Sequence, residues 1–97
     1  MTSPGSALRV TLYERKGCHL CEVALLQLRA LTMMFPFQID RVNIEGDEEL
    51  ERRFMLEIPV IEINGKVVAQ GAIDFAAVRE AVIAGRLGNT IGFTPGE

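Results

Sequence analysis

Cys18-His19-Leu20-Cys21 lies between a segment patterned as a strand and a segment patterned as a helix. In segment 7–13, which precedes the cysteines, the side chains alternate with a period of two, as in a strand. In the segment that follows, apolar residues recur at steps of three and four, as on one face of a helix. These residues are Leu20, Val23, Ala24, Leu28 and Leu31. The two cysteines are therefore predicted at a strand–helix junction, in the first turn of the helix.

The periodicity of the remaining chain predicts five further elements. The full set is strands at 8–13, 38–43, 60–63 and 66–69, and helices from 18 to 33 or 34, from 47 to 55 and from 73 to 84. Asp47 is the expected N-cap of the short middle helix, and Gly85 is expected to terminate the last one. Asn64-Gly65 between two apolar runs is a strong hairpin signal, because a type I′ turn needs positive φ at both positions.

The order β-α-β-α-β-β-α predicts an α/β fold. Two early strands joined by a helix favour a parallel crossover, and the late hairpin must be antiparallel. One mixed four-stranded sheet with helices on both faces satisfies these constraints. We expect residues 1–97 to form a single domain, with flexible segments at 1–6 and 86–97.

Composition excludes several classes of protein. The chain has 97 residues and a net charge of −3, so there is no general electrostatic basis for binding nucleic acid. No apolar run reaches the length of a membrane span, and the first residues lack the pattern of a secretory signal. We therefore expect a monomer in the cytoplasm, with neither nucleic acid nor membrane as partner. There a C-x-x-C pair is more often catalytic than structural.

The spacing of the cysteines suits reversible disulfide chemistry. Residues at i and i+3 share one face of a helix, and a disulfide needs Cα atoms about 4.4–6.8 Å apart. Unpaired N–H groups and the dipole at a helix start favour a thiolate. We expect Cys18 to be the exposed nucleophile, with a thiol pKa below that of free cysteine, and Cys21 to face inward as the resolving thiol. Lys16 and His19 would add positive charge beside them.

Other roles for the two cysteines fit the sequence less well. A structural zinc site needs four ligands, which two cysteines and the single histidine do not supply. Covalent haem attachment needs a histidine directly after Cys21, where the chain has Glu22. A pair of buried, inert cysteines is disfavoured by their place at a helix start. We therefore expect no metal and no tightly bound cofactor.

Ile58-Pro59 precedes a predicted strand, where the missing proline N–H is tolerated. Alone it is most simply a trans proline at the start of a strand. Beside a C-x-x-C pair in this topology, a cis bond would instead expose the backbone groups of Ile58. An extended peptide or glutathione could then pair with them as an added strand.

With these residues, the chain resembles the glutaredoxin-like branch of the thioredoxin superfamily. The resemblance covers about 8–84 and rests on a few stretches. They are Val10-Thr11-Leu12-Tyr13, Lys16-Gly17-Cys18-His19-Leu20-Cys21, Ile58-Pro59-Val60 and Asn64-Gly65-Lys66. It implies a thioredoxin-like fold, in which the first cysteine attacks disulfides, the second resolves, and a cis proline contacts substrate.

The resemblance implies a thiol–disulfide oxidoreductase acting on protein or glutathione mixed disulfides. Cys18 and Cys21 would be catalytic, and Lys16, His19, Ile58 and Pro59 would bind substrate, with glutathione as a candidate co-substrate. The chain departs from glutaredoxins at Ala69-Gln70-Gly71, where a Gly-Gly pair is common. This keeps open a glutathione-independent, thioredoxin-like donor, served by a thioredoxin-reductase-type partner. A redox-inactive binding module with the same fold is the alternative from another class.

Overall fold

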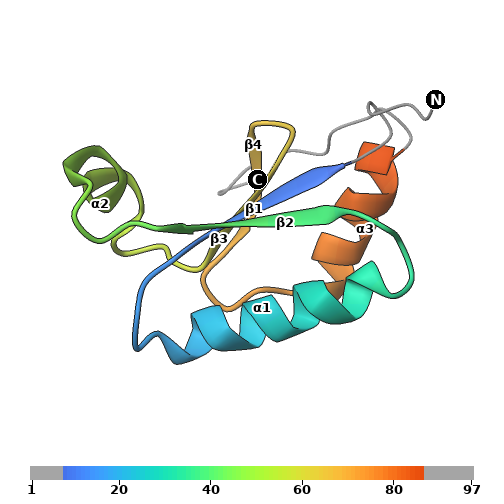
Figure 1. Cartoon of the computed structure of the whole chain (residues 1–97), viewed down its shortest axis with the longest axis horizontal. Helices are drawn as coiled ribbons and strands as arrows, with labels where there is room; N and C mark the ends of the chain where they lie inside the picture. The colour runs from blue at the N-terminus through green and yellow to red at the C-terminus, as the bar shows by residue number, and fades with distance from the viewer. Residues whose placement is uncertain (1–7, 87–97) are drawn as a thin grey trace.

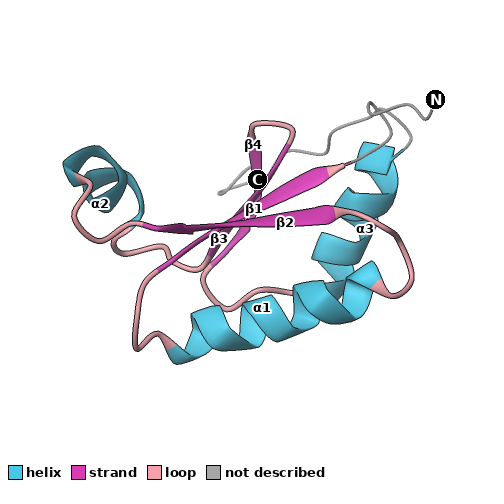
Figure 2. Ribbon diagram, in the orientation of Figure 1, coloured by secondary structure: helices cyan, strands magenta, loops and turns pink. Residues whose placement is uncertain are grey.

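Seven elements follow one another in residues 8–86, the part of the chain that the computed structural model describes (Figures 1 and 2). They are β1 (Arg9–Glu14), α1 (His19–Thr32), β2 (Gln38–Asn43), α2 (Glu48–Phe54), β3 (Val60–Ile63), β4 (Lys66–Gln70) and α3 (Phe75–Arg86). This is the predicted order, and it forms the predicted thioredoxin-like fold. The predictions of flexibility for 1–6 and 87–97 lie outside the described residues.

The four strands form one mixed sheet in the order β2-β1-β3-β4. β1 pairs in parallel with β2, as expected for two strands joined by the helical crossover α1. β3 is antiparallel to both β1 and β4. The hairpin between β3 and β4 turns at Asn64 and Gly65, whose φ angles of 54° and 79° are both positive as a type I′ turn requires.

The sheet carries helices on both faces, as predicted. Val10 and Leu12 of β1 are fully buried, and with Ile61 and Ile63 of β3 they pack into the main core beneath α1 and α3. Figure 1 shows these two helices together on one side of the sheet. The residues that alternate with these along β1 and β3 face the opposite side of the sheet. Tyr13 and Val60 form a second, smaller cluster with Leu50 and Phe54 of α2.

The start of α2 agrees with its predicted cap, whereas α1 and α3 begin one and two residues later than predicted. The Asp47 carboxylate accepts a hydrogen bond from the Leu50 N–H at 3.1 Å and so caps α2. α1 begins at His19, one residue later than predicted, because Cys18 occupies the N-cap position in an extended conformation. Within residues 8–86, no helix combines the length and apolar character needed to cross a bilayer.

The prediction that Gly85 terminates the last helix is wrong. α3 continues through Gly85 to Arg86, a residue that was expected to be part of a flexible end. A Cβ on Gly85 would lie 3.1 Å from Leu8 Cδ1 and 3.2 Å from Ile63 Cγ2. Glycine at this position thus lets the helix approach the sheet closely, and it does not end the helix.

Candidate functional site

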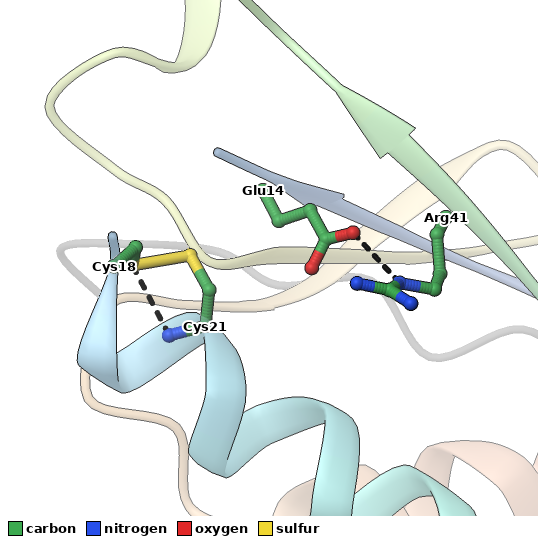
Figure 3. Close-up of polar contacts among 4 residues, drawn as sticks. All are labelled: Glu14, Cys18, Cys21 and Arg41. Carbon is green, nitrogen blue, oxygen red and sulfur yellow. Dashed lines mark hydrogen bonds and ion pairs between the residues drawn. A yellow bond between two sulfur atoms is a disulfide. The ribbon is translucent and has the colours of Figure 1, made fainter. Parts of the chain in front are cut away.

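Cys18 and Cys21 form a disulfide across the first turn of α1, with their Cα atoms 5.2 Å apart (Figure 3). The two residues differ sharply in exposure. Cys18 is partly exposed at the end of the loop formed by residues 15–18, here called the thiol loop, whereas Cys21 is 1% exposed and starts the buried face of the helix. A reagent or substrate from solution therefore reaches Cys18 first.

The N-terminus of α1 acts directly on the Cys18 sulfur. The backbone N–H of Cys21 donates a hydrogen bond to Cys18 Sγ at 3.1 Å. This N–H is one of the groups at a helix start that have no partner within the helix. In the reduced protein the same donor and the helix dipole would favour a Cys18 thiolate over the thiol.

The register of the sheet brings Pro59 to the end of the sheet that carries the thiol loop. Val60 pairs with Tyr13, and the thiol loop begins directly after the neighbouring Glu14. The Ile58–Pro59 peptide bond is cis. Pro59 is buried, and its carbonyl accepts a hydrogen bond from the Gly71 N–H at 2.9 Å.

One of the two backbone groups of Ile58, the N–H, already has a hydrogen-bond partner within the protein. Its N–H donates to the Phe54 carbonyl at 3.0 Å, which closes the turn after α2. The expectation that both backbone groups are free to pair with an extended substrate is therefore wrong for the N–H. Its carbonyl accepts no hydrogen bond from residues 8–86, so the substrate-binding role of Ile58 stays a prediction that rests on this one group.

Lys16 and His19 lie on either side of Cys18 in the sequence, and both are exposed. Lys16 lines a surface cleft of about 370 Å³ that reaches Cys21. His19 is the first residue of α1 and is not among the residues that line this cleft. Their predicted roles in binding substrate stay predictions.

The cleft contains a pair of residues that sequence reasoning missed. Arg41 Nε donates to Glu14 Oε2 at 2.8 Å, and both side chains line the cleft together with Cys21 (Figure 3). The available signal was the alternation of β1, in which Glu14 follows Val10 and Leu12 on the side that faces the core. A carboxylate at a core-facing position needs a polar partner, but no local pattern indicates which residue supplies it.

Tyr13 lies on the opposite face of the sheet and packs against α2. Its ring centroid is 4.5 Å from that of Phe54, and its hydroxyl donates to Glu62 Oε1 at 3.0 Å. Burial raises the pKa of the Tyr13 phenol above its usual value, and the hydrogen bond to Glu62 raises it further. This aromatic therefore has a packing role on the far side of the sheet from the cysteines.

Metal binding finds no support in the described part of the chain. Residues 8–86 hold no group of three or more His, Cys, Asp or Glu side chains placed to share an ion. The chemistry that this arrangement can perform is that of its two sulfurs, which form and break a bond between an exposed and a buried position.

Residues 9–88 match the family model described as Glutaredoxin-like domain (DUF836). The match covers most of the chain and includes both cysteines, the proline and all seven elements. The chain belongs to this glutaredoxin-like family. Among curated proteins, none is similar enough in sequence to match.

Two solved structures resemble this glutaredoxin-like chain at 29% identity. One is protein Ne2328 from Nitrosomonas europaea, with a TM-score of 0.69 over 80% of this chain and 94% of the other. The other is a structural genomics target, XcR50 from X. campestris, with a TM-score of 0.67 over 77% and 96%. Thioredoxin 1 from Thermosipho africanus shares the fold alone, at 13% identity and a TM-score of 0.59 over 82% and 94%. Family, fold and cysteine geometry together support a redox-type thiol function.

Proposed function

We propose that this glutaredoxin-like protein is a small thiol–disulfide oxidoreductase that reduces protein or glutathione mixed disulfides. The observation that carries the proposal is the asymmetry of the Cys18–Cys21 disulfide. Cys18 caps α1 with its sulfur on a backbone N–H, and Cys21 lies one turn behind it with 1% exposure. An attacking sulfur and a protected second sulfur are what a two-step exchange requires.

The two steps follow from these positions. The Cys18 thiolate attacks one sulfur of the client disulfide, which releases the other client sulfur as a thiolate and leaves Cys18 in a mixed disulfide. Cys21 then loses its proton and attacks Cys18 Sγ, which forms the observed disulfide and releases the second client thiol. The client gains two electrons and two protons, and the protein loses them. A dithiol donor, or two molecules of a monothiol such as glutathione, must then reduce the protein for the next cycle.

The surroundings of the thiol loop favour anionic or extended substrates. Arg15 and Lys16 are exposed in the loop and line the cleft, so they can meet a carboxylate such as those of glutathione. The Ile58 carbonyl, which accepts no hydrogen bond within residues 8–86, lies at the same end of the sheet and offers one acceptor to an extended backbone. We propose glutathione as a co-substrate on this basis.

The test traps the intermediate of the first step. Cys21→Ser, reduced and then mixed with oxidised glutathione or with a disulfide-bonded peptide, should accumulate one adduct on Cys18, read by intact-protein mass spectrometry. Cys18→Ser is the matched control and should form no stable adduct, because its remaining thiol is buried.

Each result assigns the protein to one of the candidate functions. Adducts with both disulfides support the proposal as stated. An adduct with the peptide alone would replace it with a glutathione-independent, thioredoxin-like donor. The absence of any adduct on Cys21→Ser would overturn redox catalysis and leave a binding module with the same fold.

A further inference from the structure

Helix α1 is apolar on two opposite sides. One side carries the buried residues that pack against the sheet, and the other side faces away from the molecule. This second side carries an apolar row, here called the outer row, formed by Val23, Leu26, Ala30 and Met33. Leu26 is 65% exposed and Met33 is 86% exposed. Figure 1 shows α1 along the lower edge of the molecule, with the sheet above it, so the outer row points to the outside.

The outer row is continuous along the helix. Its members follow one another at steps of three, four and three residues, so each side chain lies beside the next on the helix surface. Met33, the C-cap, keeps helical backbone angles of −73° and −23° and so extends the row past the last helical residue. Single exposed apolar side chains are common on proteins, but a surface helix is normally polar on its outer side. The spacing of the outer row is that of the seam along which two helices pack.

Two opposite charges lie along one side of the outer row. Glu22 and Arg29 are seven residues apart, so they project in nearly the same direction from the helix. Both are exposed, and neither side chain forms an ion pair within residues 8–86. The acid lies near the start of the row and the base lies near its end. A copy of the helix running in the reverse direction would therefore set base against acid and acid against base.

We propose that the outer row is a dimer interface for a second copy of this chain, with the two α1 helices antiparallel and the two-fold axis at Leu26. Leu26 then meets Leu26 of the partner subunit, and a residue four positions before the axis lies opposite one four positions after it. Glu22 thus lies opposite Ala30 of the partner subunit, one residue from the partner's Arg29. Because the interface is isologous, it contains this ion pair twice. The proposal replaces the expectation of a monomer.

Other arrangements of two copies fit the charges less well. In a parallel pair of α1 helices, each Glu22 would lie level with Glu22 of the partner subunit, and the bases would likewise lie level with each other. The outer edge of β2 offers a second route, because β2 is the last strand on its side of the sheet. A two-fold axis at the middle of β2 would set Asp40 or Arg41 directly opposite its own copy, which is destabilising.

The size of α1 limits the strength of the dimer. The helix has 14 residues and is therefore about 21 Å long. An interface along one side of such a helix belongs to the small specific interfaces, which bury less than about 1,200 Å² in total. We therefore expect a dissociation constant between about 10 µM and about 1 mM, with monomers in dilute solution and dimers in concentrated solution.

Sedimentation equilibrium of the full chain, kept reduced to prevent intermolecular disulfides, measures this constant at concentrations up to about 2 mM. Leu26→Glu should raise it at least about tenfold, because the change removes the central apolar contact and places two carboxylates at the axis. Leu56→Glu is the matched control. Leu56 is 90% exposed but follows α2, which packs on the opposite face of the sheet, so its replacement should leave the constant unchanged.

Charge reversal tests the direction of the two helices. Glu22→Arg and Arg29→Glu should each raise the dissociation constant at least about threefold, because each variant sets like charges against one another at both ion pairs. An equimolar mixture of the two variants should associate as strongly as the wild type, because every arginine then faces a glutamate of the partner. The mixture contains the same substituted chains as the separate samples, so damage to the monomer would not be rescued.

Each contrary result overturns a stated part of the proposal. A wild-type protein that stays monomeric up to about 2 mM would overturn the dimer and leave the outer row to a helix of another protein. A dimer that Leu26→Glu does not weaken would overturn this location of the interface. A mixture of Glu22→Arg and Arg29→Glu that associates no better than either alone would overturn the antiparallel arrangement. If Leu26→Glu fails to fold, the charge-reversal mixture still decides between these results.

Discussion

The backbone N–H of Cys21 donates a hydrogen bond to the sulfur of Cys18 at 3.1 Å, so each cysteine of the pair has its own environment. Cys18 sits where a helix start favours negative charge, and Cys21 sits in the first layer of the core. Two thiols only three positions apart should therefore differ in reactivity.

In the reduced protein, Cys18 should react with iodoacetamide at least about tenfold faster than Cys21, because the thiolate fraction and the exposure both favour Cys18. Peptide mass spectrometry after short exposure to the reagent measures the two sites separately. The unfolded protein in urea is the control and should show nearly equal rates. Equal rates in the folded protein would contradict the assigned order of attack.

The phenol of Tyr13 should titrate at higher pH in the folded protein than in the unfolded chain, because burial and the hydrogen bond to Glu62 raise its pKa above the usual value near 10.0. The chain has one tyrosine and no tryptophan, so tyrosinate absorbance reports this residue alone. Glu62→Gln should reduce the shift, because Glu62 raises the pKa both through the hydrogen bond and through its charge.

The same shift determines how stability responds to alkaline pH. The folded state holds the Tyr13 proton more tightly, so this contribution is fully present below pH 10 and is lost as pH rises through the folded pKa. Tyr13→Phe should therefore flatten the fall of the free energy of unfolding above about pH 10. A folded midpoint at or below that of the urea-unfolded chain would contradict the argument.

Asp47→Ala should lower the free energy of unfolding by about 1 kcal/mol, because it removes the carboxylate that caps α2 through the Leu50 N–H. Urea denaturation measures the change. Asp47→Asn is the matched control: asparagine caps equally well and should recover most of the loss. A loss in Asp47→Asn as large as that in Asp47→Ala would assign the effect to charge and not to capping.

Gly85→Ala should destabilise the protein by about 1 kcal/mol, although alanine is the better helix former. Helix propensity favours alanine by about 1 kcal/mol, but a Cβ pressed against Leu8 and Ile63 overpacks the core, which costs about 1–3 kcal/mol. Ala77→Gly, at an exposed position of the same helix, measures how much helix propensity alone changes the free energy of unfolding. A gain in stability from Gly85→Ala would show that the two neighbours move aside.

Local patterns were sufficient for the type and order of every element in residues 8–86, and for the N-cap at Asp47 and the turn at Asn64-Gly65. These patterns were less reliable where one residue type can have more than one structural role. Gly85 was interpreted as a helix end because glycine is common there, whereas its place in the structure reflects how closely α3 packs on the sheet. The internal hydrogen bond of the Ile58 N–H likewise depends on how the turn after α2 closes.

The amino-acid sequence alone determined that two thiols lie one turn apart at the start of a helix, because periodicity and spacing are properties of neighbouring residues. The surroundings of those thiols depend instead on tertiary contacts. Glu14 and Arg41 are 27 residues apart, and they meet beside Cys21 because β1 and β2 pair in one register. Contacts of this kind depend on strand pairing and helix packing across the whole domain, which no local pattern of residues encodes.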